Sequence, residues 1–184
     1  MESWQEIKFK NVVKQEYDFS CGSASISMLL QLHGIKVTEI AILDLLKKDY
    51  KQVDHLKDNF NNQTLENIAS NNSLSMLDIK KVGEHYGFTV HALSFPFEKI
   101  NQLKHPAIVH LETPKSLHYS VLISKNNNYF NLLDPTNGEI TLSSNKFKKI
   151  YTGNLLIFQP KKGSVLLKDF GMDMKINPLI FHIF

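Results

Sequence analysis

The sequence predicts an α+β domain in which helices come first and an antiparallel sheet follows. In the first half of the chain, apolar residues recur at the spacing of amphipathic helices. From residue 88 onward the pattern changes to a period of two, and turn sequences rich in asparagine, glycine and proline separate the alternating segments. This order favours helices packed beside one antiparallel sheet over alternating βαβ units.

The N-terminal part predicts a short extended segment and then a helix that begins at Cys21. Residues 5–13 alternate loosely and are read as a short strand or an extended arm. The segment from Cys21 has helical spacing, with Ser20 as the expected N-cap and Gly34 as the expected stop. The small residues at its start would let another backbone approach closely.

Two more helices are expected before the sheet. Thr38 caps an amphipathic segment over 38–48, and Ser75 opens another over 75–86 with an acidic residue three positions later. The polar, asparagine-rich residues 50–73 between them predict a loop with weak helical structure.

The second half predicts a meander of short strands. The expected strands cover residues 88–94, 106–112, 118–124, 129–135, 139–143 and 154–159, and the expected short helical pieces cover 95–103 and 144–153. Residues 1–160 are therefore assigned to one domain. Residues 161–184 form an extension whose final apolar side chains need burial on this domain or on a partner.

Composition excludes several classes of function. Of the 184 residues, 42% are hydrophobic and 21% charged, and the net charge is +3, which is ordinary for a globular protein. All 21 basic residues are lysines, whereas recognition of phosphates and bases favours arginine, so nucleic-acid binding is not expected. No stretch is long and apolar enough for a transmembrane segment, and no signal peptide is visible.

Cys21 is the residue most suggestive of chemistry. It is the single cysteine, and it stands at a predicted helix start, where the helix dipole and free N–H groups favour a thiolate. A small buried hydrophobic role is the ordinary alternative. Gln15, six residues upstream, could donate to an oxyanion together with the Cys21 backbone N–H, although a glutamine in a polar loop is usually just solvated.

His118 is the favoured base among eight histidines. It starts a predicted strand, and Asp134 ends the next one, so a hairpin at the opposite end would bring the two residues together. A carboxylate there could orient the imidazole and stabilise its cation. The alternatives are an ordinary strand-end histidine and an Asp-Pro turn. The sequence has no HExxH spacing and no second cysteine, so neither a metal nor a cofactor is predicted.

The segments QEYDFSCGSASISMLL, LHYSVLI and NLLDPTNGEI resemble the conserved boxes of the C39 cysteine peptidases, and the resemblance runs over roughly residues 8–158. It implies a papain-like fold and assigns Cys21, His118 and Asp134 as the catalytic residues, with Gln15 in the oxyanion hole. The choice of His118 over the other seven histidines leans on this match. The chain lacks an ABC-transporter membrane region, so it looks like a stand-alone member. It is most similar to members that accompany functional-amyloid or surface-fibre secretion.

The resemblance implies a cysteine endopeptidase that cuts after small residues, such as a double glycine, in a secreted precursor or a secretion-system component. Expected partners are that peptide or protein substrate and secretion-system or fibre-subunit proteins. The alternative is a non-catalytic C39-like module that binds peptides and assists secretion, and another papain-like acyl-transfer enzyme is a second rival. The resemblance favours the periplasm, while the single cysteine also fits the cytoplasm.

Overall fold

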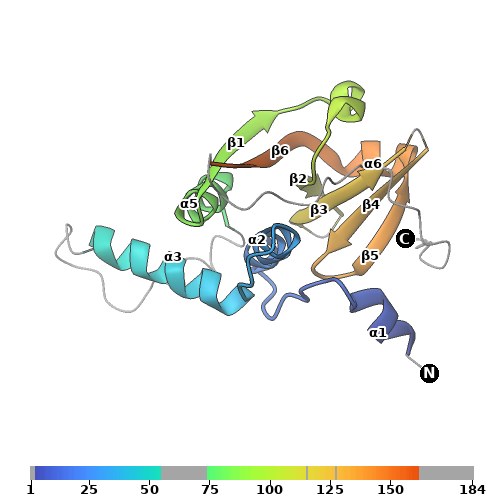
Figure 1. Cartoon of the computed structure of the whole chain (residues 1–184). Helices are drawn as coiled ribbons and strands as arrows, with labels where there is room; N and C mark the ends of the chain where they lie inside the picture. The colour runs from blue at the N-terminus through green and yellow to red at the C-terminus, as the bar shows by residue number, and fades with distance from the viewer. Residues whose placement is uncertain (1–2, 55–73, 115, 127, 162–184) are drawn as a thin grey trace.

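The computed structural model describes residues 3–54, 74–114, 116–126 and 128–161. It contains helices packed beside a six-stranded antiparallel sheet (Figure 1). The α+β prediction is therefore confirmed. The predicted extension over 161–184, apart from its first residue, and most of the predicted loop over 50–73 lie outside the described residues.

The sheet has the strand order β1-β6-β2-β3-β4-β5. Its strands are β1 (Phe88–Ser94), β2 (Ala107–Glu112), β3 (Leu117–Lys125), β4 (Tyr129–Asp134), β5 (Gly138–Ser143) and β6 (Tyr151–Pro160). The meander prediction holds for β2 to β5 but is wrong for β6, which lies between β1 and β2. Leu155 and Leu156 pack into the two different cores of the protein. A strand that is buried on both faces belongs inside a sheet, and the loose alternation of β6 concealed this.

The helices are α1 (Trp4–Phe9), α2 (Cys21–Leu32), α3 (Glu39–Asp54), α5 (Met76–His85) and α6 (Ser144–Ile150), with a 3-10 helix η1 (Phe97–Gln102). The prediction of an extended segment over residues 5–13 is wrong. Ser3 and Glu6 form a capping box in which each side chain accepts a hydrogen bond from the other residue's backbone N–H. This local capping starts a helix where the apolar pattern indicated a strand.

The ends of α2 agree with the sequence only in part. Gly34 has φ +76° and follows the helix, as expected of a glycine stop. Ser20 precedes the helix, but its side chain makes no capping bond. Its hydroxyl instead lies 2.8 Å from the Tyr17 carbonyl oxygen, so it stabilises the turn that leads into Cys21.

The remaining helix predictions are confirmed, with two changes of length. The piece predicted over 144–153 ends at Ile150, where β6 follows. The Thr38 hydroxyl accepts from the Ala41 N–H and caps α3, which continues to Asp54, beyond the predicted end at 48. Ser75 and Asp78 form the expected capping box of α5.

Two hydrophobic cores lie on the two faces of the sheet. On one face, α2 and α5 pack against the strands, with Leu29, Val82 and Val121 among the buried residues. In Figure 1, α2 lies between α5 and the strands β3 and β4. On the other face, α6 and η1 cover the sheet, and Phe130 stacks on Phe147. The N-terminal end of α2 thus comes close to the strands that carry the predicted base and carboxylate.

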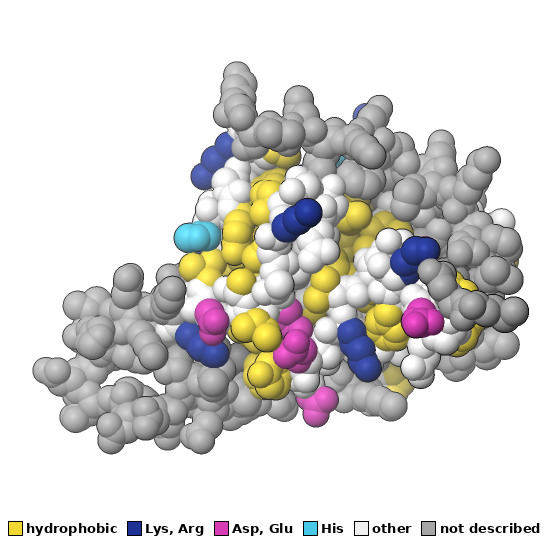
Figure 2. Space-filling model, turned by 60° about the horizontal axis from the view of Figure 1, so that its bottom comes forward, with side chains coloured by type: hydrophobic (Ala, Val, Ile, Leu, Met, Phe, Trp, Pro, Cys, Tyr) yellow, Lys and Arg dark blue, Asp and Glu magenta, His cyan; other side chains and the backbone are white. Residues whose placement is uncertain are grey.

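The surface shown in Figure 2 mixes lysine and acidic side chains with apolar ones, and the described charges on this face do not separate by sign. That pattern differs from the single-sign footprint of a nucleic-acid-binding face. Within the described segments, no helix combines the length and the apolar character that a membrane crossing requires.

Candidate active site

The hairpin of β3 and β4 brings His118 and Asp134 together. The strands are antiparallel, with Val121 opposite Leu133, and their connection lies at the far end. The start of β3 therefore meets the end of β4, and His118 Nε2 lies 3.0 Å from Asp134 Oδ2. Both side chains are almost fully buried, so water screens their interaction weakly.

Five hydrogen-bond donors converge on the Asp134 carboxylate. Oδ2 accepts from His118 and from the Ser120 hydroxyl, which is 2.6 Å away. Oδ1 accepts from the backbone N–H groups of Thr136 (3.0 Å) and Asn137 (2.8 Å), and from Asn137 Nδ2 (3.1 Å). Burial alone would raise the pKa of Asp134, but the hydrogen bonds and the charge of His118 outweigh it and hold the pKa below its usual value. The carboxylate is therefore ionised and fixed in orientation.

The side chain of Cys21, the first residue of α2, lies beside His118 and interacts with its imidazole. Asp134 occupies Nε2, which leaves Nδ1 as the ring nitrogen for the thiol. Burial disfavours the imidazolium, yet its bonds to Asp134 and Cys21 prevail and raise the pKa of His118. A protonated imidazole thus lies beside the thiol at a helix N-terminus, the surroundings typical of a reactive cysteine.

A contact between α2 and β3 holds this arrangement in register. Ser25, one turn after Cys21, donates from its hydroxyl to the Tyr119 carbonyl oxygen at 3.1 Å. Tyr119 directly follows His118, so the helix is fixed next to the residue whose ring the thiol must meet.

Gln15 lies beside the turn that follows Asp134. Its backbone N–H donates to the Pro135 carbonyl at 3.1 Å, and its Oε1 accepts from the Thr136 hydroxyl at 3.0 Å. Its Nε2 donates to the Tyr17 carbonyl at 3.0 Å and lies 3.4 Å from that of Asp18. In this arrangement the amide is engaged with its own loop, and its oxyanion role stays a prediction.

Sequence reasoning missed Ser120 and Asn137. Ser120 stands two residues after His118 and therefore on the same face of β3, and extending the strand register places it opposite Asp134. Period-two alternation starting from His118 could have found it. Asn137 lies three residues after Asp134 in a turn, where a carboxylate commonly accepts from backbone N–H groups.

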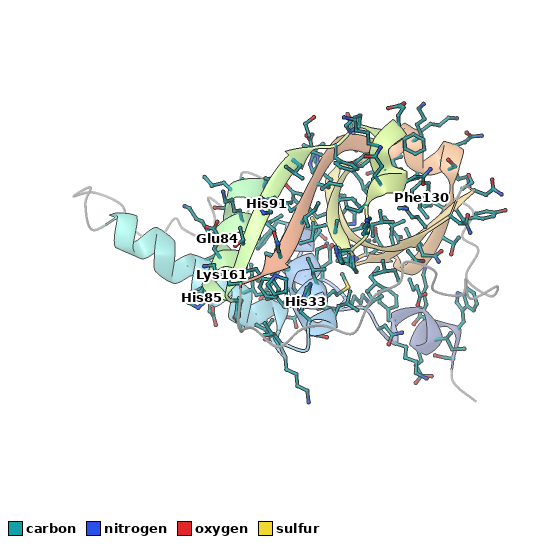
Figure 3. All side chains as sticks on the ribbon, turned by 45° about the horizontal axis from the view of Figure 1, so that its top comes forward. His33, Glu84, His85, His91, Phe130 and Lys161 are labelled. Atoms are coloured by element: carbon teal, nitrogen blue, oxygen red, sulfur yellow. The ribbon has the colours of Figure 1, made fainter. Side chains whose placement is uncertain are left out.

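His85 and His91 belong to α5 and β1, on the side of the molecule away from Phe130 of β4 (Figure 3). His110 of β2 lies near the cluster, since its ring centroid is 5.0 Å from that of Tyr119, and burial and the charge of His118 lower its pKa. In the ranges that the structure describes, no three His, Cys, Asp or Glu side chains gather to hold a metal ion.

The sequence matches the peptidase C39 family over residues 52–163, which is more than half of the chain. The chain belongs to the peptidase C39 family. The matched span contains His118, Ser120 and Asp134, whereas Cys21 and Gln15 precede it.

Solved structures of C39 domains share the fold, which is papain-like. The peptidase domain of Streptococcus ComA superimposes with a TM-score of 0.62 and 21% identity, over 82% of this chain and 98% of that domain. A double glycine motif protease from an AMS/PCAT transporter, solved with its leader peptide, gives a TM-score of 0.61 and 23% identity, over 82% of this chain and 91% of that one. The predicted papain-like fold is thereby confirmed.

Among curated proteins, the probable functional amyloid protease FapD of Pseudomonas aeruginosa is 28% identical over 156 residues. That alignment covers 83% of this chain but 62% of FapD. The chain thus spans less than two thirds of that relative, and the similarity places it among peptidases without transferring FapD's role.

Proposed function

We propose that this C39 family member is a cysteine endopeptidase with Cys21 as nucleophile and His118 as acid and base. One observation carries the proposal. The thiol at the start of α2 lies beside an imidazole whose other side is held by the fully bonded Asp134 carboxylate. Nucleophile, base and orienting group in this relation are the set that acyl transfer uses.

In the proposed reaction, the Cys21 thiolate attacks the carbonyl carbon of the scissile bond and a C–S bond forms. The His118 imidazolium gives its proton to the leaving amine as the C–N bond breaks. A water molecule then attacks the thioester while His118 takes its proton. The C–S bond breaks, the acid product leaves, and the thiolate–imidazolium pair is regenerated. The Cys21 backbone N–H and Gln15 are proposed to stabilise the oxyanion, which requires the Gln15 amide to turn from its loop when substrate binds.

We propose a substrate with small residues, such as two glycines, before the cleaved bond. Cys21 is only 3% exposed. A thiol this enclosed favours a substrate backbone that carries little side-chain bulk. The names of the similar proteins, a double glycine motif protease and a functional amyloid protease, agree with this class and with a secreted precursor as substrate.

Mass spectrometry of candidate secreted precursors, incubated with wild-type protein and with Cys21→Ala, tests the proposal. We expect fragments that end after small residues with the wild-type protein alone. Replacing the residue before the cleaved bond by valine should abolish them. Precursors that bind but stay intact would overturn the peptidase function in favour of a binding module, and fragments that persist with Cys21→Ala would exclude Cys21 as nucleophile.

A further inference from the structure

Glu39 is a buried carboxylate that the proposed reaction does not use. It is the first residue of α3 and is 3% exposed. Its two oxygens lie 3.2 Å and 3.4 Å from the Glu16 backbone nitrogen, which donates to them. The Ser20 hydroxyl is a second partner, and it can direct its single hydrogen to Glu39 or to the Tyr17 carbonyl. A side chain of this kind is rarely buried without a specific reason.

Both partners of Glu39 belong to the loop of residues 15–20, which leads directly into Cys21. The start of this loop is fixed to the sheet, because Gln15 bonds to Pro135 and Thr136 in the turn after Asp134. Glu16, the second residue of the loop, is fixed to α3 through Glu39, and Ser20 at the end of the loop interacts with the same carboxylate. The loop therefore connects the helical part with the sheet part, and its position sets how the thiol meets the imidazole.

We propose that Glu39 is a positioning residue whose ionised carboxylate holds the loop of residues 15–20 so that Cys21 meets His118. The inference concerns the pairing of Cys21 with His118, and its consequence for peptide cleavage rests on the proposed function. Glu39 acts through Glu16 and Ser20 and touches neither the substrate nor the reacting atoms.

Because the pKa of Glu39 is shifted, its effect on the loop depends on pH, which is not the case for a contact between uncharged groups. Burial raises the pKa of Glu39 above its ordinary value of 4.5; the bonds from Ser20 and the Glu16 N–H oppose this shift, and the Glu16 charge adds to it. Glu16 is the charged neighbour from the loop, while α2 contains no charged residue. Position 39 is at the helix start, where the dipole favours a negative charge.

The raised pKa of Glu39 predicts that ionisation of this carboxyl has opposite effects on the stability of the fold and on the position of the loop. A carboxyl whose pKa is higher in the folded than in the unfolded state stabilises the fold when protonated, and that contribution is lost as the pH rises through the folded value. Ionised Glu39 therefore costs stability at neutral pH while it holds the loop. Protonation in mildly acid solution should stabilise the fold and loosen the loop.

The test compares wild-type protein with Glu39→Gln, which keeps the shape and one acceptor but removes the charge. The primary measurement is the rate at which iodoacetamide alkylates Cys21, followed by intact mass from acid to neutral pH. It needs no substrate. We expect Glu39→Gln to react about tenfold more slowly at neutral pH, because a hydrogen bond to a charged group is lost. Its thermal unfolding midpoint should equal or exceed that of the wild type.

Two further variants sharpen the result. Glu16→Gln removes the negative charge that faces Glu39 but keeps the backbone N–H donor. The alkylation rate is expected to fall in acid as Glu39 becomes protonated, and in this variant that fall should occur at lower pH. Glu84→Gln, on the exposed side of α5 beside Lys80, should change neither rate nor stability. Cleavage of a precursor, measured in parallel, should follow the alkylation rates.

Equal alkylation rates for wild type and Glu39→Gln across the pH range would overturn the inference. A slower rate accompanied by a lower unfolding midpoint would also overturn it, because that pattern indicates a merely structural role. If the wild-type protein cleaves no precursor, the proposed function fails, and the alkylation rates still decide the role of Glu39.

Discussion

Replacing Asp134 by asparagine forces the introduced amide to present either oxygen or nitrogen to His118. Three donors converge on Oδ1, at 3.0, 2.8 and 3.1 Å, and two of them are backbone N–H groups. Backbone N–H groups cannot become acceptors, so the amide oxygen must occupy this position. The amide nitrogen then faces His118 Nε2, where the carboxylate oxygen lies 3.0 Å away.

This arrangement reverses the tautomer of His118. Nε2 must accept from the introduced amide, so the ring proton moves to Nδ1 and faces Cys21, and the imidazole can no longer take a proton from the thiol. The imidazolium also loses the negative charge that raises its pKa. The same tautomer reversal in a serine protease triad lowers kcat about 10⁴-fold. We expect Asp134→Asn to lower kcat by about 10³- to 10⁴-fold, with a small change in KM.

The assay is steady-state cleavage of a precursor, with thermal unfolding measured on the same samples. Asp44→Asn is the matched control, since it makes the same chemical change at an exposed position on α3 and should leave kcat unchanged. A folded Asp134→Asn protein that keeps more than about a tenth of wild-type kcat would refute the reasoning, because the tautomer would then not matter.

Three other substitutions test separate parts of the account. Ser120→Ala removes the 2.6 Å bond to Asp134 and should lower kcat about tenfold; an unchanged kcat would show that the remaining donors suffice to orient the carboxylate. Gln15→Ala should lower kcat by about 10²-fold or more if its amide stabilises the oxyanion, and a change below about threefold would remove it from the mechanism. Gly83→Ala should lower the free energy of unfolding in urea by about 1–3 kcal/mol, because the added Cβ would lie 2.5 Å from Phe158 and from Val90; a stability equal to the wild type would show that α5 moves away without cost.

Much of the fold could be predicted because the local patterns are strong. The capping box at Ser75, the glycine stop at Gly34 and the alternating strands all give local signals that survive in the structure. The errors arise where another interaction outweighs the pattern. The capping box at Ser3 starts a helix despite the alternating pattern that follows it. The burial of β6 on both faces depends on tertiary packing, which a short stretch of sequence does not show.

The candidate site, like the fold, could be predicted only in part. The placement of His118 and Asp134 at strand ends follows from hairpin geometry, whereas the contact with Cys21 depends on how α2 packs against β3, which the sequence does not encode locally. The role of Ser120 could have been predicted from the period-two alternation of the strand. The role of Glu39 could not, because its partners Glu16 and Ser20 are about twenty residues away and meet it only in the folded protein.

The ultraviolet absorbance of the Cys21 thiolate at neutral pH tests the central claim most directly. The signal is the difference between wild-type protein and Cys21→Ala, and His118→Ala is the comparison. The account predicts a thiolate absorbance in the wild-type protein that is lost when His118 is replaced. The same absorbance with and without His118 would contradict the thiolate–imidazolium pair on which the proposed chemistry depends.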